Sequence, residues 1–383
     1  MQIGLIGFPQ VGKRTLFRLL TGVDTAATPP NGPVIGISPV RDARVDRLAA
    51  LYHPQKTTPA TIQYLLLPDM TQDSTSNQQL FKAIEKVDAI AHVVRAFSDD
   101  SVFHLEGSVD PLRDIARMHA ELILNDLLFV EKRLERLQKE LARTNDEAKK
   151  KEQALMERCR AHLEQELPLR GLACSPEEQR ALANYPFLTR KAVLIVLNVG
   201  EDAIGDTALI ERVRDRFKGQ GVGVAPPPAC GSRSEPLPQA APPVGGHAGG
   251  GVVQVSAKIE EELAQLDDAD ERAAFLKELG IRESALDQLT RVSHQTLGLI
   301  VYFTVGEDEV RAWTIRRGAS APEAGGAIHS DITRGFIRAE LIKFDDLLAL
   351  GSEAAVQRVG KAQLKGKDYV VEDGDILNFR FSV

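Results

Sequence analysis

A glycine-bracketed turn near the start of the chain has the residue types that bind phosphate. Residues 7–15 read Gly-Phe-Pro-Gln-Val-Gly-Lys-Arg-Thr, between an apolar run that begins at Ile3 and a helical pattern. In the pattern G-x-x-x-x-G-K-[ST], backbone N–H groups and the helix start bind phosphates, and the lysine reaches the β- and γ-phosphates. Gly7, Gly12 and Lys13 match it, so we expect Gln10, Val11, Gly12, Lys13, Arg14 and Thr15 to bind a nucleotide.

Arg14 replaces the Ser or Thr whose hydroxyl normally ligates Mg²⁺, and Thr15 follows one position late. A guanidinium has no acceptor lone pair and carries positive charge, so it does not ligate a cation. Arg14 either supplies part of the missing metal charge or pairs with Asp69 and blocks the metal site. The loop therefore predicts phosphate binding more firmly than Mg²⁺-dependent hydrolysis.

Asp69 follows an apolar strand pattern over residues 61–67 and is our candidate metal ligand. In nucleotide-hydrolysing folds this carboxylate usually opens D-x-x-G, whose glycine amide faces the γ-phosphate. Here the segment reads Asp69-Met70-Thr71-Gln72, without the glycine. The alternative is that Asp69 only caps the next helix.

Two later turns have the residue types that border a base. Asn198-Val199-Gly200-Glu201 follows the apolar residues 192–197, and Ser256-Ala257-Lys258 follows residues 252–255. Guanine recognition normally uses N-K-x-D, but this chain lacks the lysine and has the longer Glu201. We therefore expect Asn198, Ser256, Ala257 and Lys258 at the base, with adenine at least as plausible as guanine.

The elements that must position these residues form an α/β pattern. Apolar strands at five places alternate with helical patterns, which predicts a doubly wound sheet of the P-loop NTPase type. Residues 25–39, rich in proline and glycine, are predicted to be loop. Residues 219–251, rich in glycine, proline and alanine, are predicted to be a flexible insertion.

A heptad seam over residues 120–141 and a second stripe at Leu155, Cys159 and Leu163 predict an antiparallel coiled-coil hairpin. It is either a packed helical subdomain or an arm for a partner. Residues 297–383 read as a small α+β domain whose basic side chains suggest RNA or scattered solvated charges. Those side chains are Arg311, Arg316, Arg317, Arg334, Arg338, Lys361, Lys365 and Lys367.

Composition restricts the protein class. The chain of 383 residues is 43% apolar and 26% charged, as in soluble globular proteins, and its net charge of −7 argues against a wholly basic nucleic-acid coat. No apolar run reaches the roughly 18 residues of a membrane span, and the N-terminus does not read as a signal peptide. Cys159, Cys174 and Cys230 lack metal-ligand spacing, so we expect free thiols in the cytoplasm.

Several motifs together resemble the Obg-like ATPase family of the YchF type. They are the phosphate loop, the N-x-x-E at residues 198–201, and the run Val-Asp-Ala-Ile-Ala-His-Val-Val-Arg at residues 87–95. The densest match lies at residues 302–304, 309–315, 335–340 and 366–371.

The resemblance implies an OBG-type nucleotide-binding domain at residues 1–110 and 190–296. It also implies an inserted helical coiled-coil domain at 111–189 and a C-terminal β-grasp domain of the TGS type at 297–383. Family members prefer ATP to GTP and are associated with ribosomes and stress responses. The resemblance also implies that Thr15 lies beside the α-phosphate and that Val199 borders the base next to Asn198.

The chain departs from the family on the catalytic side. The family's G-K-S-T, D-I-A-G and T-I-E-P-N become Gly-Lys-Arg-Thr at residues 12–15, Asp-Met-Thr-Gln at 69–72 and Ala-Thr-Pro-Pro-Asn at 27–31. We therefore expect a cytoplasmic, ribosome-associated protein that binds ATP, or GTP, with weak or lost hydrolysis and doubtful Mg²⁺. The alternatives are an active Mg²⁺-dependent ATPase or GTPase and a non-enzymatic ribosome or RNA interaction protein. The sequence leaves the oligomeric state open.

Overall fold

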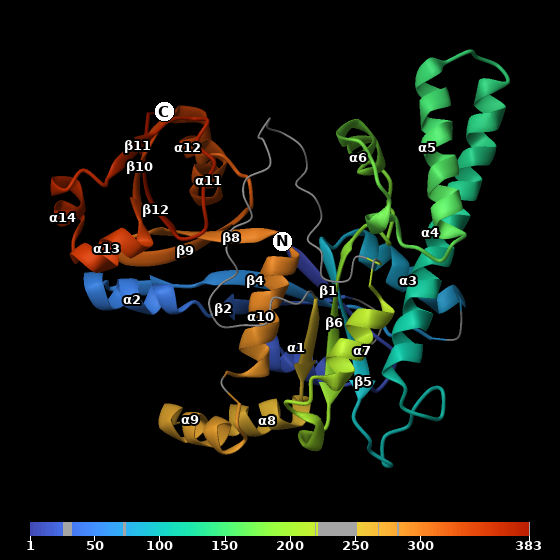
Figure 1. The fold of residues 1–383 in the computed structure, drawn as a ribbon, viewed down its shortest axis with the longest axis horizontal. Coiled ribbons are helices and arrows are strands. Elements are labelled where there is room, and N and C mark those ends of the chain that lie inside the picture. Colours follow the sequence, from blue (N-terminus) through green and yellow to red (C-terminus); the bar gives the residue numbers. More distant parts are fainter. Residues whose placement is uncertain are drawn as a thin grey trace. The chain divides into compact units, whose positions relative to one another are not determined.

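The computed structural model describes residues 1–25, 33–71, 74–218, 220, 251–266, 268–281 and 283–382 (Figure 1). The predicted insertion lies almost wholly outside these residues, as do residues 27–31, Gln72 and Cys230. The described chain forms two compact units, residues Met1–Ile37 with Gln63–Thr296, and residues Ser38–Ile62 with Leu297–Val383. No described helix combines the length and apolarity needed to cross a membrane.

A six-stranded sheet in the order β2-β4-β1-β5-β6-β7 forms the centre of the first unit. The neighbours β4, β1, β5, β6 and β7 pair in parallel. The central strands are apolar and buried on both faces, as parallel strands covered by helices must be. The strands are β1 (Gln2–Ile6), β2 (Val34–Val40), β4 (Ala60–Leu66), β5 (Ala89–Ala96), β6 (Ala192–Val199) and β7 (Val252–Val255).

Helices pack against this sheet: α1 contacts β1, α4 contacts β5, and α10 contacts β6 and β7. The architecture confirms the predicted α/β class. The helical segments of this unit other than the hairpin described below are α1 (Lys13–Thr21), α3 (Ser74–Glu85), η2 (Glu201–Ala203), α7 (Ala208–Arg216), α8 (Ala257–Gln265), α9 (Ala269–Glu278) and α10 (Ala285–Thr296).

The prediction that residues 25–39 are all loop is wrong for their second half, because β2 begins at Val34. Pro33, Gly36 and Pro39 suggested a loop. Strand β2 lies at the edge of the sheet, where a proline does not remove a required ladder hydrogen bond.

The predicted hairpin consists of α4 (Pro111–Leu141) and α5 (Glu147–Leu163), followed by η1 (Leu169–Gly171) and α6 (Pro176–Leu182). Its buried core includes Val130, Leu134 and Leu137 of α4 against Leu155 and Cys159 of α5. The seam begins later than predicted, because Ala120 is exposed. Cys159 and Cys174 are free thiols.

The second unit has a sheet in the order β11-β10-β12-β8-β9-β3. Its last strand, β3 (Lys56–Thr58), comes from the N-terminal half of the chain and pairs in parallel with β9. This unit therefore takes residues 38–62 from within the stretch 1–110 that we assigned to the nucleotide-binding domain. The remaining elements are α2 (Ala43–Tyr52), β8 (Leu299–Thr304), β9 (Glu309–Arg316), α11 (Ala321–Ile328), α12 (Ser330–Gly335), β10 (Phe336–Lys343), α13 (Phe344–Leu350), α14 (Glu353–Arg358), β11 (Gln363–Lys365) and β12 (Asp375–Phe381).

Arg44 at the start of α2 fastens the N-terminal segment to the rest of the second unit. Its guanidinium forms ion pairs with Asp42 and Asp373 at 2.7 Å each and lies over the Phe303 ring. Tyr52, at the other end of α2, donates a hydrogen bond to Glu353 at 2.7 Å. Helix α2 is therefore held at both ends by residues of the C-terminal sequence.

Two buried histidines make the stability of the first unit depend on pH. Burial lowers the pKa of His92 to about 3, with smaller contributions from His119 and Lys13, and burial also lowers the pKa of His119 to about 3. Below about pH 6.5 the unfolded chain takes up protons at these positions and the folded chain does not, so stability is full above that pH and falls as pH decreases.

For each of the two histidines, we expect the unfolding free energy to be about 2 kcal/mol lower at about pH 5 than at about pH 7.5. Urea unfolding at the two pH values measures this loss, which His92→Leu should reduce. The exposed His53 provides the control, because His53→Asn should leave the loss unchanged. An unchanged pH dependence in His92→Leu would contradict the assignment.

Candidate functional site

The glycine turn joins β1 to α1 in a conformation that its residues explain. Gly12, which caps α1, has φ 88°, in the left-handed region. A Cβ atom on Gly12 would lie 2.3 Å from Nδ2 of Asn198, and one on Gly7 would lie 2.6 Å from the Val93 carbonyl oxygen. Both positions therefore require glycine. Gln10 is exposed with φ 61°, and Val11 is buried.

The lysine of the turn lies against the end of β4. Nζ of Lys13 donates to the carbonyl oxygens of Leu67 at 2.7 Å and Pro68 at 3.1 Å, and it lies 2.8 Å from Oδ1 of Asp69. Burial lowers the pKa of Lys13, and Asp69 opposes that shift. The ammonium group is therefore held by the carboxylate that we predicted as a metal ligand.

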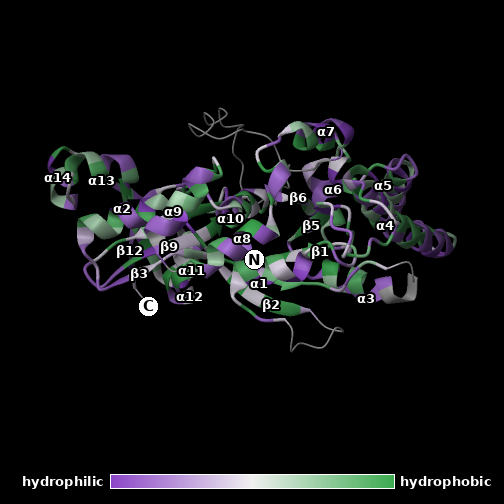
Figure 2. Ribbon diagram, turned by 90° about the horizontal axis from the view of Figure 1, so that it is seen from below, coloured by the Kyte–Doolittle hydropathy of each residue, from purple (hydrophilic) through white to green (hydrophobic). Residues whose placement is uncertain are grey.

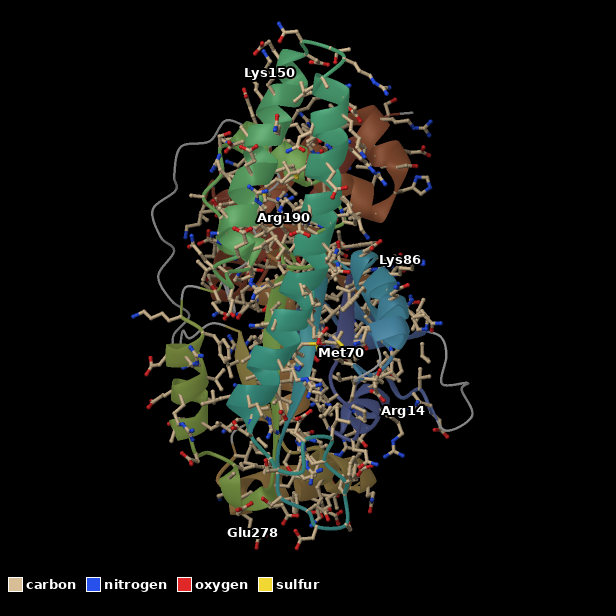
Figure 3. The ribbon with its side chains drawn as sticks, turned by 90° about the vertical axis from the view of Figure 1, so that its right-hand side faces the viewer. Arg14, Met70, Lys86, Lys150, Arg190 and Glu278 are labelled. Carbon is tan, nitrogen blue, oxygen red and sulfur yellow. The ribbon has the colours of Figure 1, made fainter. Side chains whose placement is uncertain are left out.

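Arg14 does not take the alternative position that we considered for it. Its side chain is exposed, and no ion pair joins it to Asp69 or to any other carboxylate that the structure describes. In Figure 3 Arg14 is labelled at the surface of the ribbon near α1. Thr15 is half-buried in the first turn of α1.

One buried side chain connects the phosphate turn to the second base-side turn. Asn198, at the end of β6, is 3% exposed. Its Nδ2 donates to the Val11 carbonyl oxygen at 3.0 Å, and its Oδ1 accepts from the Ala257 N–H at 3.1 Å. Asn198 therefore holds the two turns in register, and Val199 beside it is buried in β6.

The second base-side turn precedes α8. Ser256 is buried, and its Oγ has no hydrogen-bond partner among the described residues. Lys258 is exposed and forms an ion pair with Glu201 at 2.5 Å, and that hydrogen bond raises the pKa of Lys258. Glu201 thus links the two base-side turns at the surface.

The structure brings the predicted residues to one edge of the sheet. Residues 198–199 form the carboxyl end of β6. The turn of residues 10–15, Asp69 and residues 256–258 follow the carboxyl ends of β1, β4 and β7. In open α/β sheets this edge is where ligands bind. The contact of each residue with a nucleotide or metal stays a prediction.

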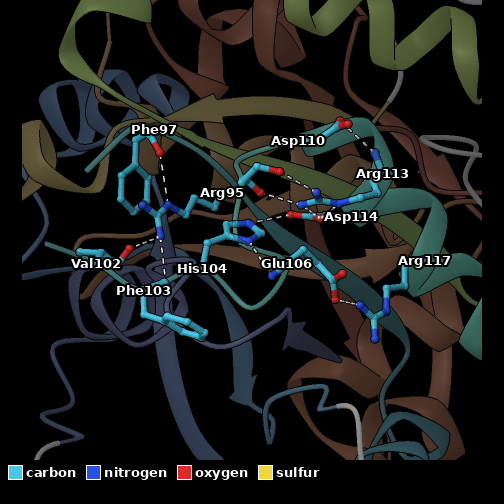
Figure 4. A network of polar contacts seen from close by, with 11 residues as sticks. Arg95, Phe97, Val102, Phe103, His104, Glu106, Asp110, Arg113, Asp114 and Arg117 are labelled. Carbon is cyan, nitrogen blue, oxygen red and sulfur yellow. Dashed lines mark hydrogen bonds and ion pairs between the residues drawn. The ribbon is translucent and has the colours of Figure 1, made fainter. Parts of the chain in front are cut away.

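Sequence analysis did not single out the segment after β5, which Figure 4 shows. Arg95 is buried and donates to the carbonyl oxygens of Phe97, Asp99, Val102 and Phe103. A buried arginine at the end of an apolar strand was the available signal. Arg95 organises the loop by donating to backbone carbonyl oxygens. A sequence motif does not reveal such contacts, because every residue has a backbone carbonyl.

The same segment contains a histidine with defined partners. The Glu106 N–H donates to Nδ1 of His104 at 3.1 Å, so the proton of a neutral His104 lies on Nε2, which faces Asp114 at 3.2 Å. Arg117 of α4 pairs with Glu106, and its guanidinium lies over the ring of Phe8 at 5.6 Å. Helix α4 therefore contacts the phosphate turn.

Fold and site define a P-loop nucleotide-binding protein with a second compact unit, formed by residues 38–62 and 297–383. The family profile YchF-GTPase_C, described as a protein of unknown function (DUF933), matches residues 299–382. The solved structure of the Schizosaccharomyces pombe YchF GTPase matches 99% of this chain and 97% of its own, with TM-score 0.81 and 30% identity.

Curated relatives match along the whole chain. A ribosome-binding ATPase YchF of Bacillus subtilis is 40% identical over 388 aligned positions that cover 99% of both proteins. One of Escherichia coli O157:H7 is 37% identical with the same coverage, and an Obg-like ATPase 1 of rice is 35% identical, covering 100% of this chain and 92% of its own. The chain belongs to the YchF family of Obg-like ATPases, which confirms the resemblance.

The amide of Asn198 leads to a direct test. Asn198→Ala leaves the Val11 carbonyl and the Ala257 N–H buried without a partner, at about 1–3 kcal/mol for each group. We expect a loss of about 2–5 kcal/mol in the unfolding free energy, measured by urea unfolding, together with weaker nucleotide binding measured by calorimetry.

Asn184→Ala is the matched control, since Asn184 is exposed and should tolerate the change. Equal stability of the two variants would show that the amide does not hold the turns together.

Proposed function

We propose that this protein binds ATP at the carboxyl edge of its parallel sheet, hydrolyses it slowly or not at all, and acts on the ribosome in the cytoplasm. The observation that carries the proposal is the asymmetry of the site. The base-side turns are joined by Asn198, whereas the metal side has Arg14 at the hydroxyl position and Asp69 paired with Lys13. The names of the relatives support ATP and the ribosome.

The residues present fit a nucleotide. The turn at residues 10–15 supplies backbone N–H groups at a helix start, and Lys13 supplies the charge for the β- and γ-phosphates. Lys13 has to leave Asp69 to reach a phosphate, so phosphate oxygens compete with a carboxylate for the same ammonium group. The Oγ of Ser256, which has no hydrogen-bond partner in the part of the chain that the structure describes, lies in the turn expected at the base.

Adenine is favoured by the carboxylate at the base side. A guanine-reading aspartate accepts from the N1 and N2 protons of the base, and this chain has a longer glutamate, Glu201. In the structure Glu201 forms its ion pair with Lys258. A carboxylate that is already neutralised is a weaker acceptor for guanine.

Slow hydrolysis follows from the loss of metal ligation. A bound Mg²⁺, for which Asp69 is the candidate ligand, would supply positive charge against the negative charge that develops during phosphoryl transfer. Arg14 is an exposed cation without a metal-ligating atom, and Asp69 has Lys13 as its partner. The chain thus keeps groups that bind and orient phosphates, whereas position 14 offers no hydroxyl for the ion.

Replacing Arg14 by the residue type of the pattern tests the proposal. For the unaltered protein we expect ATP affinity that changes less than about threefold with Mg²⁺. For Arg14→Ser we expect at least a tenfold gain with Mg²⁺, equivalent to about 1.4 kcal/mol, and faster ATP hydrolysis. Calorimetry and a phosphate-release assay measure the two quantities, with GTP as the comparison nucleotide.

Arg18→Ser is the matched control, since Arg18 is another exposed arginine of α1 and pairs with Glu261. It removes the same charge without restoring the pattern, so it should leave the Mg²⁺ response unchanged. Rapid Mg²⁺-dependent turnover by the unaltered protein would refute slow hydrolysis. The second candidate function is an active ATPase, which the name of the relatives, ribosome-binding ATPase, favours. In that case Asp69 and water would hold the ion.

A further inference from the structure

One face of α4 carries a row of cations that the nucleotide site does not use. The row consists of Lys132, Arg136, Lys139 and Arg143, which we call the basic stripe. The first three belong to α4, and Arg143 follows its last turn. Spacings of four, three and four residues keep these positions within about 60° of one another around a helix and span about 16 Å along it.

The basic stripe faces away from the partner helix. On α4, Val130, Leu134 and Leu137 form the buried seam against α5, and these positions lie opposite the stripe on the helical wheel. Each cation of the stripe is exposed. Figure 3 shows side chains with nitrogen and oxygen tips extending outward from the end of the hairpin, where Lys150 is labelled, and Figure 2 shows that this end is largely hydrophilic.

Acidic side chains at the end of the hairpin are already engaged elsewhere. Glu140 pairs with Lys149 at 2.9 Å, and Glu147 pairs with Lys150 at 2.7 Å. Asp146 caps α5 by accepting from two backbone N–H groups. These carboxylates therefore neutralise other cations or a helix end.

The remaining carboxylates that the structure describes in this region form no ion pair with the stripe either. Glu152 pairs with Arg133 at 2.7 Å, and Glu131 and Glu135 are exposed on the flank of the stripe. Among the described residues, no ion pair joins a cation of the stripe to a carboxylate. The stripe thus presents four positive charges to solvent on a protein whose net charge is −7.

The C-terminal unit offers a weaker case for a polyanion. Three of the eight basic residues that we singled out there from the sequence have carboxylate partners: Arg311 with Glu309, Arg334 with Asp331, and Lys361 with Asp346. Their charges are compensated locally, in contrast to the stripe.

We propose that the basic stripe of α4 binds the phosphodiester backbone of structured RNA. A linear row of four exposed cations complements a linear polyanion, and each phosphate contact gains free energy through counterion release. Protein interfaces are dominated by large side chains buried in pockets, mainly aromatic ones and arginine, whereas the stripe consists of four charged side chains that are all exposed. This inference rests on the proposed function, because it assigns the ribosomal partner to RNA and its contact surface to the hairpin.

A protein partner is the alternative that the test must separate. Leu124 and Leu128 of α4 are 51% and 47% exposed, and Leu128 lies four residues before Lys132. A ribosomal protein with an acidic and apolar surface would contact these leucines as well as the cations. Binding to RNA alone does not require them.

The test uses the full chain with all four cations of the stripe replaced by glutamine, which keeps helix propensity high. The control replaces four other exposed cations of the helical insertion, Lys150, Lys151, Arg160 and Arg180, by glutamine. Both variants lose four positive charges. Fluorescence anisotropy measures the affinity for a labelled RNA duplex over a range of salt concentrations. Sedimentation measures binding to ribosomes, and a further titration measures binding to ribosomal RNA stripped of protein. Calorimetry measures the affinity for ATP.

We expect the stripe variant to bind the duplex, the stripped RNA and ribosomes at least tenfold more weakly, with unchanged ATP affinity. The slope of log affinity against log salt concentration should become shallower by roughly two to four in the stripe variant, about one for each phosphate that it no longer neutralises. In the control variant this slope should change by less than about one. Equal losses of affinity in both variants would reduce the effect to net charge and overturn the proposal.

Loss of ribosome binding with unchanged affinity for stripped RNA would assign the stripe to a ribosomal protein and also overturn the proposal. If the unaltered protein fails to bind ribosomes, the proposed ribosomal function fails, while the duplex titration still decides whether the stripe binds RNA.

Discussion

The arrangement of the candidate site depends on the carboxamide of Asn198. It is buried, it accepts from one turn and donates to another, and both partners are backbone groups. Because Gly12 has no Cβ, the phosphate turn can approach this amide closely. A glycine at position 12 and an asparagine at position 198 are therefore two parts of one constraint. This constraint fixes the distance between the phosphate turn and the turn before α8, although no regular hydrogen-bond ladder joins these two loops.

Lys13 shows a second feature of the site, the competition for a single buried cation. An ammonium group with little exposure needs a counter-charge, and Asp69 together with two carbonyl oxygens provides it. When a phosphate binds, Lys13 would exchange one anionic partner, Asp69, for another. The free-energy cost of burying its ammonium group is therefore already offset before a ligand arrives. The same pairing leaves Asp69 less negative toward an incoming metal ion.

Sequence reasoning succeeded where a local rule determines the structure. Gly7, Gly12 and Lys13 predicted the turn, apolar runs predicted the parallel strands, and heptad spacing predicted the hairpin. It failed at β2, where Pro33 and Pro39 obey the rule for loops although an edge strand tolerates them. The partners of Lys13 and Arg95 are set by tertiary packing and by backbone carbonyls, which carry no residue signature.

The path of the chain through the second unit bears on how the protein is made. Thr58 of β3 and Glu309 of β9 form a hydrogen bond although they are 251 residues apart. During synthesis at about 5–20 residues per second, β3 waits roughly 10 to 50 s for its partner strand to be translated. Residues 38–62 therefore leave the ribosome long before the sheet that receives them exists. A chain cut short before Glu309 would keep this segment permanently without its sheet, so C-terminal truncations also disturb the N-terminal half.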